Sequence, residues 1–366
     1  MYLKTLQLVN FKNYESAYFE FNPKINCFLG KNSVGKTNIL DAIYYLSFTK
    51  SFITPTDSYN MRIGESMFMI QGTFLRKEKE EQIDCGFKKG QKKQFRRNKT
   101  AYKKYADHIG LFPLVMISPL DSELITGGSE LRRKLMDGVI SQYNKEYLNA
   151  LIQYTAALKQ RNALLKQFAK EHSYREDLIL VWNEQLERFG RIVFLERQKF
   201  ITNFLPVFNK YYQILTNDTQ EVDLSYQSQL FDGDLSISLQ ENIAKDRALQ
   251  YTSVGTHKDD LLFSLNHLPI KRIGSQGQQK TFLLALKLAQ YQHIYELSGT
   301  CPILLLDDIF DKLDMERVRN LIQIISREEF GQIFITDTNE ERLQKVLPQD
   351  ESQIQIFNMN ERNKNI

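Results

Sequence analysis

The chain has 366 residues, of which 42% are hydrophobic and 25% charged, and its formal net charge is +4. This size and composition allow two or three lobes around a large core, and they exclude a disulfide-dependent miniprotein and a disordered chain. The mildly basic balance is compatible with a polyanionic partner but is too weak to identify one.

The cysteines and the N-terminus predict a cytoplasmic protein. Cys27, Cys85 and Cys301 are far apart and show no Cys-x-x-Cys spacing, which favours buried thiols in a reducing compartment over disulfides or a metal site. Lys4 and Lys12 interrupt the N-terminal segment, so it lacks the apolar core of a signal peptide. No run reaches the ~20 apolar residues of a membrane span, so no membrane association is expected.

The first 46 residues have the order of elements that a phosphate-binding loop requires. Residues 3–21 alternate like two strands separated by Asn13 and Tyr14. Residues 25–29 are continuously apolar, as in a buried strand, and residues 38–46 have a helical period. The glycine-rich octet at 30–37 lies between that strand and that helix.

This octet is the predicted ATP site. Its glycines would let backbone N–H groups surround the β-phosphate, Lys36 would reach the β- and γ-oxygens, and the Thr37 hydroxyl would hold Mg²⁺. A glycine-rich turn without a ligand is the alternative. The predicted ATP-binding residues are Gly30, Lys31, Asn32, Ser33, Val34, Gly35, Lys36 and Thr37.

A basic stretch with interleaved Phe95 and Tyr102 follows, and it could track DNA phosphates. A lysine-rich hairpin edge that prevents aggregation explains it equally well. The candidate DNA contacts are Lys92, Lys93, Arg96, Arg97, Lys103 and Lys104.

Apolar residues at three- and four-residue spacing from 129 to 208 predict an inserted helical lobe, either an arm that helps to clamp DNA or a simple lid. We therefore divide the chain into an N-terminal ATPase part with an antiparallel subdomain at 1–128, the helical arm at 129–249 and a C-terminal ATPase part at 250–366. The polar tail from Asn358 to Lys364 is expected to fray.

An ABC-type signature precedes a helix predicted at 281–291. Its residues are Ser275, Gln276, Gly277 and Gln278. A serine and a glycine at a helix N-terminus form an anion site, yet the chain already has a phosphate loop, so we expect Ser275 and Gly277 to serve the nucleotide of a second copy in a homodimer. The alternative is a glutamine-rich N-cap with no partner.

Residues 302–308 predict a buried parallel strand that ends in paired acids, as in a Walker B motif. Asp307 would orient Mg²⁺, and Asp308 would polarise the attacking water, so the expected catalytic residues are Lys36, Asp307 and Asp308. The acids could instead cap the next helix. The following strand carries no switch histidine, which leaves Thr336 as the expected γ-phosphate sensor.

These elements predict an α/β fold, an ABC-type P-loop ATPase head with a mixed sheet, helices on both faces and an inserted helical lobe. Beyond the shared ATPase motifs, the chain resembles the bacterial RecF family over nearly its whole length. The segments that carry this resemblance are 8–14, 35–43, 118–121, 127–137, 158–165, 254–261 and 275–280.

Departures from the family pattern are mild. Thr256 and Lys258 replace proline and arginine, Asp41 replaces glutamate, and residues 311–314 read Asp-Lys-Leu-Asp instead of Ser-Glu-Leu-Asp. No glutamine of a Q-loop is evident. His257 could be catalytic or structural, and Arg132 and Arg133 could bind nucleotide or DNA or pair with acids.

The resemblance implies a nucleoid-associated protein of recombinational gap repair. It would bind ATP and Mg²⁺, dimerise head to tail around DNA, and release it through slow, DNA-stimulated ATP hydrolysis. It would act with RecO and RecR to help load RecA. Two other classes stay open: a structural DNA tether that does not hydrolyse ATP, and the ATPase subunit of a membrane transporter.

Overall fold

The structure of the chain is a computed structural model that describes residues 1–216, 220–310, 315–347 and 351–362. The chain folds into two compact units, which are described separately. The first comprises Met1–Asp121, Tyr211–Asn217 and Lys280–Ile366, and the second comprises Ser122–Lys210 and Asp218–Gln279. This division differs from the predicted boundaries at 129 and 250, because residues 250–279 belong with the second unit.

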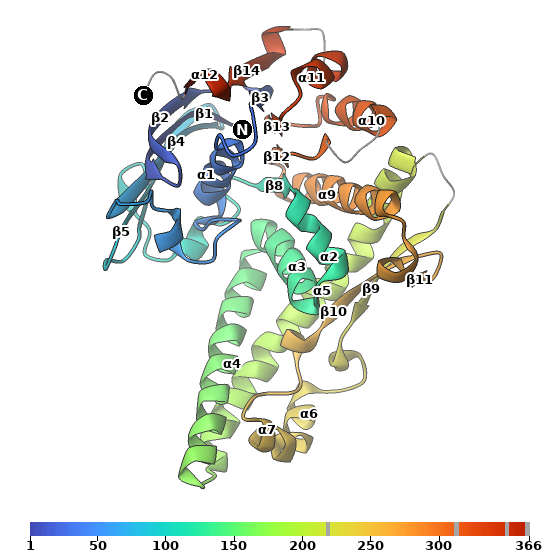
Figure 1. The fold of residues 1–366 in the computed structure, drawn as a ribbon. Helices are drawn as coiled ribbons and strands as arrows, with labels where there is room; N and C mark the ends of the chain where they lie inside the picture. The colour runs from blue at the N-terminus through green and yellow to red at the C-terminus, as the bar shows by residue number, and fades with distance from the viewer. Residues whose placement is uncertain (217–219, 311–314, 348–350, 363–366) are drawn as a thin grey trace. The chain divides into compact units, whose positions relative to one another are not determined.

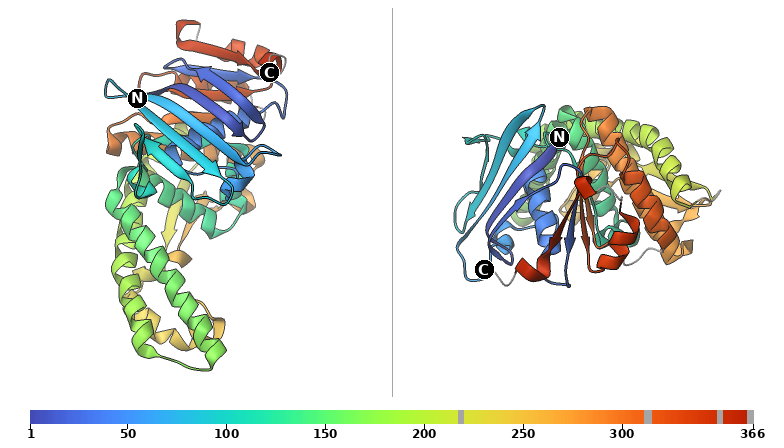
Figure 2. Two further views of the ribbon diagram at one scale, coloured as in Figure 1. Left: turned by 90° about the vertical axis from the view of Figure 1, so that its left-hand side faces the viewer. Right: turned by 90° about the horizontal axis from the view of Figure 1, so that it is seen from above.

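The first unit contains an antiparallel sheet in the order β2-β1-β4-β5-β6-β7. Figure 2, left, shows its strands side by side in blue and cyan. Leu3, Leu6 and Leu8 alternate with more exposed residues on β1, so one face of this sheet packs on the core and the other faces solvent. The strands are β1 (Tyr2–Phe11), β2 (Tyr14–Glu20), β4 (Met67–Arg76), β5 (Lys79–Lys88), β6 (Gln94–Arg97) and β7 (Thr100–Ala101).

A five-stranded parallel sheet forms the other half of this unit, in the order β14-β3-β13-β12-β8. Because parallel strands end at the same edge, the residues that follow β3, β12 and β13 lie close together there. The strands are β3 (Ile25–Leu29), β8 (Leu114–Ile117), β12 (Ile303–Asp307), β13 (Ile333–Asp337) and β14 (Ile354–Asn358).

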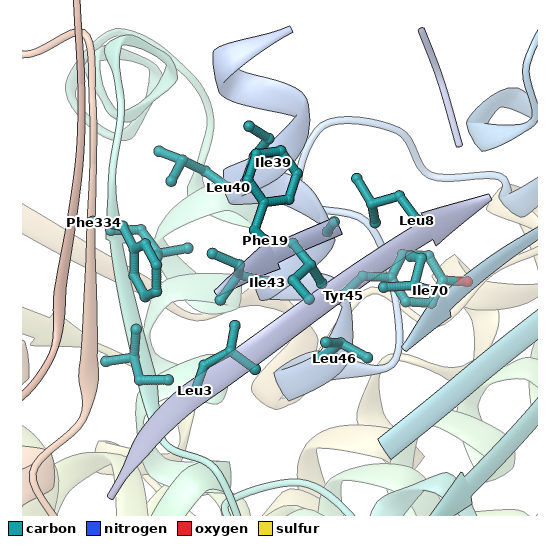
Figure 3. Close-up of a cluster of buried hydrophobic side chains, with 14 of the residues drawn as sticks. Leu3, Leu8, Phe19, Ile39, Leu40, Ile43, Tyr45, Leu46, Ile70 and Phe334 are labelled. Atoms are coloured by element: carbon teal, nitrogen blue, oxygen red, sulfur yellow. The ribbon is translucent and has the colours of Figure 1, made fainter. Parts of the chain in front are cut away.

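Helix α1 (Lys36–Phe48) contacts strands of both sheets and carries much of the core. Figure 3 shows its residues Ile39, Ile43 and Leu46 in one cluster with residues of β1 and β13. The other helices that lie wholly or partly in this unit are the end of α5 (Glu176–Thr216), α9 (Gln276–Ser298), α10 (Met315–Ile325), α11 (Glu340–Val346) and α12 (Met359–Arg362). Two sheets with helices in this arrangement confirm the predicted ABC-type ATPase head.

The second unit is the predicted helical lobe, in which α4 and α5 run side by side (Figure 1). Helix α5 continues through Pro206 to Thr216, beyond the predicted end of the helical pattern. A small antiparallel sheet, β11-β10-β9, was not predicted, and the pairing of β10 with β9 explains why residues after 250 belong here. The elements are α2 (Glu123–Thr126), α3 (Ser129–Tyr143), α4 (Lys145–Glu171), α5 (Glu176–Thr216), β9 (Val222–Gln227), α6 (Leu235–Glu241), α7 (Ile243–Leu249), β10 (Asp260–Leu265), β11 (Leu268–Pro269) and α8 (Ile270–Ile273).

A buried arginine ties the helices of the second unit together. Arg161 of α4 has no exposed surface, and its guanidinium donates to Asp246 Oδ2 at 2.6 Å and Thr252 Oγ1 at 2.8 Å. Its Nε donates to Asn183 Oδ1 of α5 at 2.7 Å. Asp246, also fully buried, accepts further hydrogen bonds from Ser253. Three helices and the segment at 252–253 thus meet at one ion pair.

Burial raises the pKa of Cys27 and of Cys85 to about 12, which keeps both thiols protonated. The prediction of a buried thiol is wrong for Cys301, which is partly exposed and lies 3.6 Å from the carbonyl oxygen of Glu329. Among the described helices, none has the length and apolar character to cross a membrane.

Candidate nucleotide-binding site

The glycine-rich octet forms a loop between β3 and α1. The loop begins at Gly30, whose N–H donates to the carbonyl oxygen of Asp337 at 3.3 Å, and this bond ties it to the end of β13. Lys36 Nζ donates to the carbonyl oxygens of Gly30 at 2.7 Å and Lys31 at 3.0 Å, so its ammonium lies across the start of the loop. The loop thus brings a cation and the N-terminus of a helix together, which is an arrangement for binding phosphate.

Gly35 is required by both its conformation and its surroundings. Its φ of 103° lies in the left-handed region that favours glycine. A Cβ atom there would lie 2.4 Å from Asn13 Nδ2 and 2.8 Å from the Tyr14 hydroxyl. Tyr14 donates to the Gly35 carbonyl oxygen at 3.1 Å, and Asn13 donates to that of Val34 at 3.2 Å. The β1–β2 turn therefore supports the phosphate loop, a role that the sequence did not reveal.

Two hydroxyls connect the paired acids at the end of the Walker B strand to each other and to the loop. Thr37 Oγ1 donates to Asp307 Oδ1 at 2.9 Å, and Thr336 Oγ1 donates to the same oxygen at 2.8 Å. The Thr336 hydroxyl also accepts from the N–H of Asp308 at 2.9 Å. Asp308 has a φ of 48°, so this bond holds it in the left-handed conformation that an aspartate adopts more readily than most residues. Thr336, the predicted γ-phosphate sensor, thus positions both acids.

Asp307 and Thr37 fit Mg²⁺. Burial raises the pKa of Asp307, while the hydrogen bonds from Thr336 and Thr37 and the charge of Lys36 act in the opposite direction. A divalent cation at this carboxylate would favour its ionised form further, and carboxylate and hydroxyl oxygens are ligands that Mg²⁺ prefers. Asp307 is the last residue of β12 and its carboxylate accepts from two hydroxyls, so a helix cap is not needed to explain it.

A cavity of about 150 Å³ lies at this edge of the parallel sheet, lined by residues from the loop, from α1 and from the ends of β12 and β13. It brings together most of the predicted residues from segments that are some 270 residues apart in sequence. Asn38 joins them and donates to Asn13 Oδ1 at 2.7 Å. The lining residues are Asn32, Ser33, Gly35, Lys36, Thr37, Asn38, Asp308 and Thr336.

The predicted signature residues lie in the second unit, directly before and at the start of α9. Ser275 Oγ accepts from the N–H of Gln278 at 3.2 Å, and Gln278 Oε1 accepts from the N–H of Ser275 at 2.8 Å. This reciprocal pair is a capping box. Ser275 and Gln276 are exposed, and Gly277 is half-buried. Ser275 therefore caps α9 and is also exposed to solvent, so the cap does not prevent an anion from approaching this turn. The Asp-Lys-Leu-Asp segment at 311–314 lies outside the described residues.

Of the six candidate DNA contacts in the basic stretch, two side chains bind other residues of the first unit and four are exposed. Lys93 Nζ donates to the carbonyl oxygen of Thr49 at 2.6 Å and to Tyr45 at 3.0 Å, and it lies 3.0 Å from Asp57 Oδ2. Arg97 Nε donates to Glu81 Oε2 at 2.6 Å. The remaining candidates for DNA contacts are exposed, namely Lys92, Arg96, Lys103 and Lys104.

We expect Lys93→Met to lower the free energy of unfolding by about 2 kcal/mol, because Asp57 and the C-terminal carbonyl of α1 lose a charged donor that is largely buried. Urea unfolding followed by circular dichroism measures this change. Lys92→Met, at the exposed neighbour, should stay within about 0.5 kcal/mol of the unsubstituted protein. Equal stability of the two variants would contradict the role of Lys93 at the end of α1.

Three basic residues whose roles the sequence left open make hydrogen bonds within the chain, and His257 is the first of them. His257 Nε2 must donate to the carbonyl oxygen of Thr252 at 3.0 Å, so its Nδ1 accepts from the Tyr154 hydroxyl at 2.7 Å. Burial lowers the pKa of His257 to about 4, which keeps it neutral.

Arg132 forms a two-point ion pair with Asp260, at 2.8 and 2.9 Å. Arg133 donates to the carbonyl oxygen of Asp259 at 2.6 Å and to Ser129 Oγ at 2.8 Å. Arg132 thus pairs with an acid, which is one of the three uses that the sequence left open. Arg133 instead binds a backbone carbonyl oxygen and a hydroxyl.

Comparison with known proteins agrees with this geometry. The family described as "RecF/RecN/SMC N terminal domain" matches residues 2–365. The DNA replication and repair protein RecF of Flavobacterium johnsoniae is 51% identical over 98% of this chain and 100% of its own length. The protein of the same name from Phocaeicola vulgatus is 50% identical over 98% of this chain and 96% of its own.

Solved structures give the same result. The recombination mediator protein RecF with ATPrS, in the RecFOR pathway, superposes with a TM-score of 0.86 at 29% identity, over 96% of this chain and 97% of that one. RecF with ATP superposes with a TM-score of 0.86 at 30% identity, over 93% and 92%. An Smc head bound to ScpA, at 14% identity and a TM-score of 0.57 over 95% and 92%, shares the fold. The chain belongs to the RecF family, among the proteins that share the RecF/RecN/SMC N terminal domain.

Proposed function

We propose that this chain binds ATP with Mg²⁺ and that two copies then pair around the nucleotides to hold DNA during repair of gapped DNA. The observation that carries the proposal is the convergence of Lys36, Thr37 and Asp307 at one edge of the parallel sheet, with a 2.9 Å bond between Thr37 and Asp307. The relatives named RecF, and the RecF structures with ATP and ATPrS, support the same nucleotide.

Each residue has a role that follows from its position. The loop N–H groups and Lys36 bind the β- and γ-phosphates, and Thr37 and Asp307 hold the metal ion. Mg²⁺ held by these two residues would offset the negative charge that develops on the phosphate oxygens. Asp308, held by Thr336, lies in the cavity wall, where its carboxylate can orient and polarise a water molecule. Its side chain is shorter than a glutamate, so we expect slow hydrolysis.

Pairing of two copies follows from the two anion sites of the chain. Ser275 lies at the N-terminus of the 23-residue helix α9, where the helix dipole favours a negative charge. A single chain supplies one phosphate loop and one such turn, so in a twofold pair the turn of each copy can cover the nucleotide of the other. ATP would then stabilise the dimer by mass action.

DNA is the polyanion that we propose the pair encloses. The exposed residues Lys92, Arg96, Lys103 and Lys104 are candidate contacts, and each phosphate that they neutralise would steepen the salt dependence of binding by roughly 0.9 in log–log slope. DNA would stimulate a weak ATPase, and hydrolysis would release the DNA. The RecFOR pathway named for the solved relatives supports RecO and RecR as partners, and we propose that the three proteins help to load RecA.

Light scattering of the pure protein, with and without Mg-ATP and duplex DNA, tests the pairing. The unsubstituted chain should double its mass with ATP, and Ser275→Arg should stay monomeric while it binds ATP normally, because the large cation blocks the turn. Ser225→Arg, at an exposed position of β9, is the matched control and should dimerise. A chain that stays monomeric at saturating Mg-ATP with DNA present would refute the proposal.

Phosphate release separates the two other functions from this one. A structural tether would bind ATP and DNA without releasing phosphate at any DNA concentration. An ATPase subunit of a transporter would co-purify with membranes and show no response to DNA.

A further inference from the structure

The C-terminal strand delivers its last residues to the start of the phosphate loop. β14 pairs in parallel with β3, with Ile356 opposite Cys27 and Asn358 opposite Leu29. The residues that follow each strand therefore also lie together: Gly30 on one side and the first turn of α12 on the other. Figure 1 shows β14 and α12 beside β3. This segment was expected to fray from Asn358 onward, but residues 358–360 end β14, begin α12 and contact the core and the loop.

Asn360 makes a direct contact with the loop. Its Oδ1 accepts from the N–H of Lys31 at 3.0 Å. A Cβ atom at Gly30 would lie 3.1 Å from Met359 Cβ and 3.3 Å from Asn360 Oδ1, so the two segments approach closely. Met359 is 2% exposed and belongs to the core, and the N–H of Asn360 donates to Asn358 Oδ1 at 3.1 Å. The burial of Met359 and the hydrogen bond to Asn358 thus fix the backbone that carries the Asn360 side chain.

The peptide group that joins Gly30 to Lys31 is held at both of its polar atoms. Its N–H, from Lys31, donates to Asn360 Oδ1 at 3.0 Å, and its carbonyl oxygen, from Gly30, accepts from Lys36 Nζ at 2.7 Å. Because the peptide group is planar, its N–H and its carbonyl oxygen turn together. A rotation that breaks the hydrogen bond to Asn360 therefore also moves the carbonyl oxygen that binds Lys36. The carbonyl oxygens of Gly30 and Lys31 are what fix the Lys36 ammonium. Asn360 therefore acts on Lys36 through one peptide.

We propose that Asn360 is a positioning residue of the phosphate-binding loop and that the C-terminal segment sets the affinity for nucleotide through it. This inference rests on the proposed binding of ATP. Asn360 would be a fourth part of the nucleotide site, besides the loop, the Walker B acids and the signature. It lies 329 positions along the chain from Lys31, whose N–H it binds.

The expected effect is moderate, since Asn360 is exposed and its bond to Lys31 is a neutral one. Loss of such a bond corresponds to about a 3- to 5-fold weakening of binding. The effect should be equal for ATP and ADP, because both place a β-phosphate in the loop, whereas a contact with the γ-phosphate would affect ATP alone.

Isothermal titration of the full chain with Mg-ATP and Mg-ADP tests the proposal with two near-isosteric variants. Asn360→Leu keeps the shape but removes the acceptor, and it should weaken both nucleotides by about 3- to 5-fold. Asn360→Asp keeps an acceptor oxygen, and it should bind both within about 2-fold of the unsubstituted chain. Ile356→Thr is the control for disturbance of β14, because Ile356 is an exposed residue of that strand and pairs with Cys27 of β3.

Three outcomes would overturn the inference: an Asn360→Leu variant that binds as the unsubstituted chain does, an Asn360→Asp variant as weak as the leucine variant, or a loss confined to ATP. Thermal melting is measured for each variant, and Asn360→Ala replaces the leucine variant in the same comparison if leucine prevents folding. Failure of the unsubstituted chain to bind either nucleotide is a different result, since it would refute the proposed function itself.

Discussion

Replacing Lys36 with methionine is expected to weaken ATP binding by at least about 100-fold. Methionine keeps the unbranched stem but removes the ammonium, and each hydrogen bond from that ammonium to a phosphate oxygen is worth about 1.5–3 kcal/mol. Lys36 is 7% exposed and is fixed by the carbonyl oxygens of Gly30 and Lys31, so no other cation can take its place without moving the loop. Titration with Mg-ATP measures the loss.

The control for this variant is Lys79→Met, which removes an exposed lysine from the start of β5 in the same unit. It should bind ATP as the unsubstituted chain does. If Lys36→Met retained affinity within about 3-fold, the loop would not be the phosphate site, whatever its resemblance to one.

Replacing Arg161 with methionine should destabilise the helical unit by about 3–5 kcal/mol, because removal of one partner leaves a buried charge without compensation. Asp246 would lose its cation while having no exposed surface, and Thr252 and Asn183 would lose a shared donor. The midpoint of urea unfolding, followed by circular dichroism at the helical minimum, should fall markedly.

Lys159→Met changes an exposed residue two positions earlier on α4, so it controls for the loss of a positive charge on that helix. It should leave the midpoint nearly unchanged. A loss below about 1 kcal/mol for Arg161→Met would mean that Asp246 finds another partner or is protonated at little cost.

The nucleotide site was predictable to the extent that its signals are local. The strand at 25–29, the loop and α1 are contiguous, and their order identifies the loop without any knowledge of the fold. The strand that ends at Asp307 has a continuous apolar run, which is typical of a buried parallel strand. The capping box at Ser275 and Gln278 is also a local signal, since the two residues have the required spacing of three.

The supporting residues could not be predicted, because their roles exist only in the folded chain. Asn13 and Tyr14 read as an ordinary hairpin turn, and Asn360 reads as part of a polar tail. Their contacts with the loop span 21 and 329 positions. Lys93 looked like its basic neighbours, and only the placement of α1 distinguishes it. The helical pattern ends at 208 in the sequence, but α5 continues to Thr216.

The close approach of Asn13 and Tyr14 to Gly35 has a consequence for how such proteins can diverge. The space beside Gly35 is filled by the first hairpin, so a change at position 13 or 14 alters what position 35 can tolerate, and the reverse holds. The hairpin turn and the loop should therefore evolve as a coupled pair of segments: across distant relatives, substitutions in the hairpin turn should accompany shifts in the backbone of the loop, and grafting one segment without the other should fail.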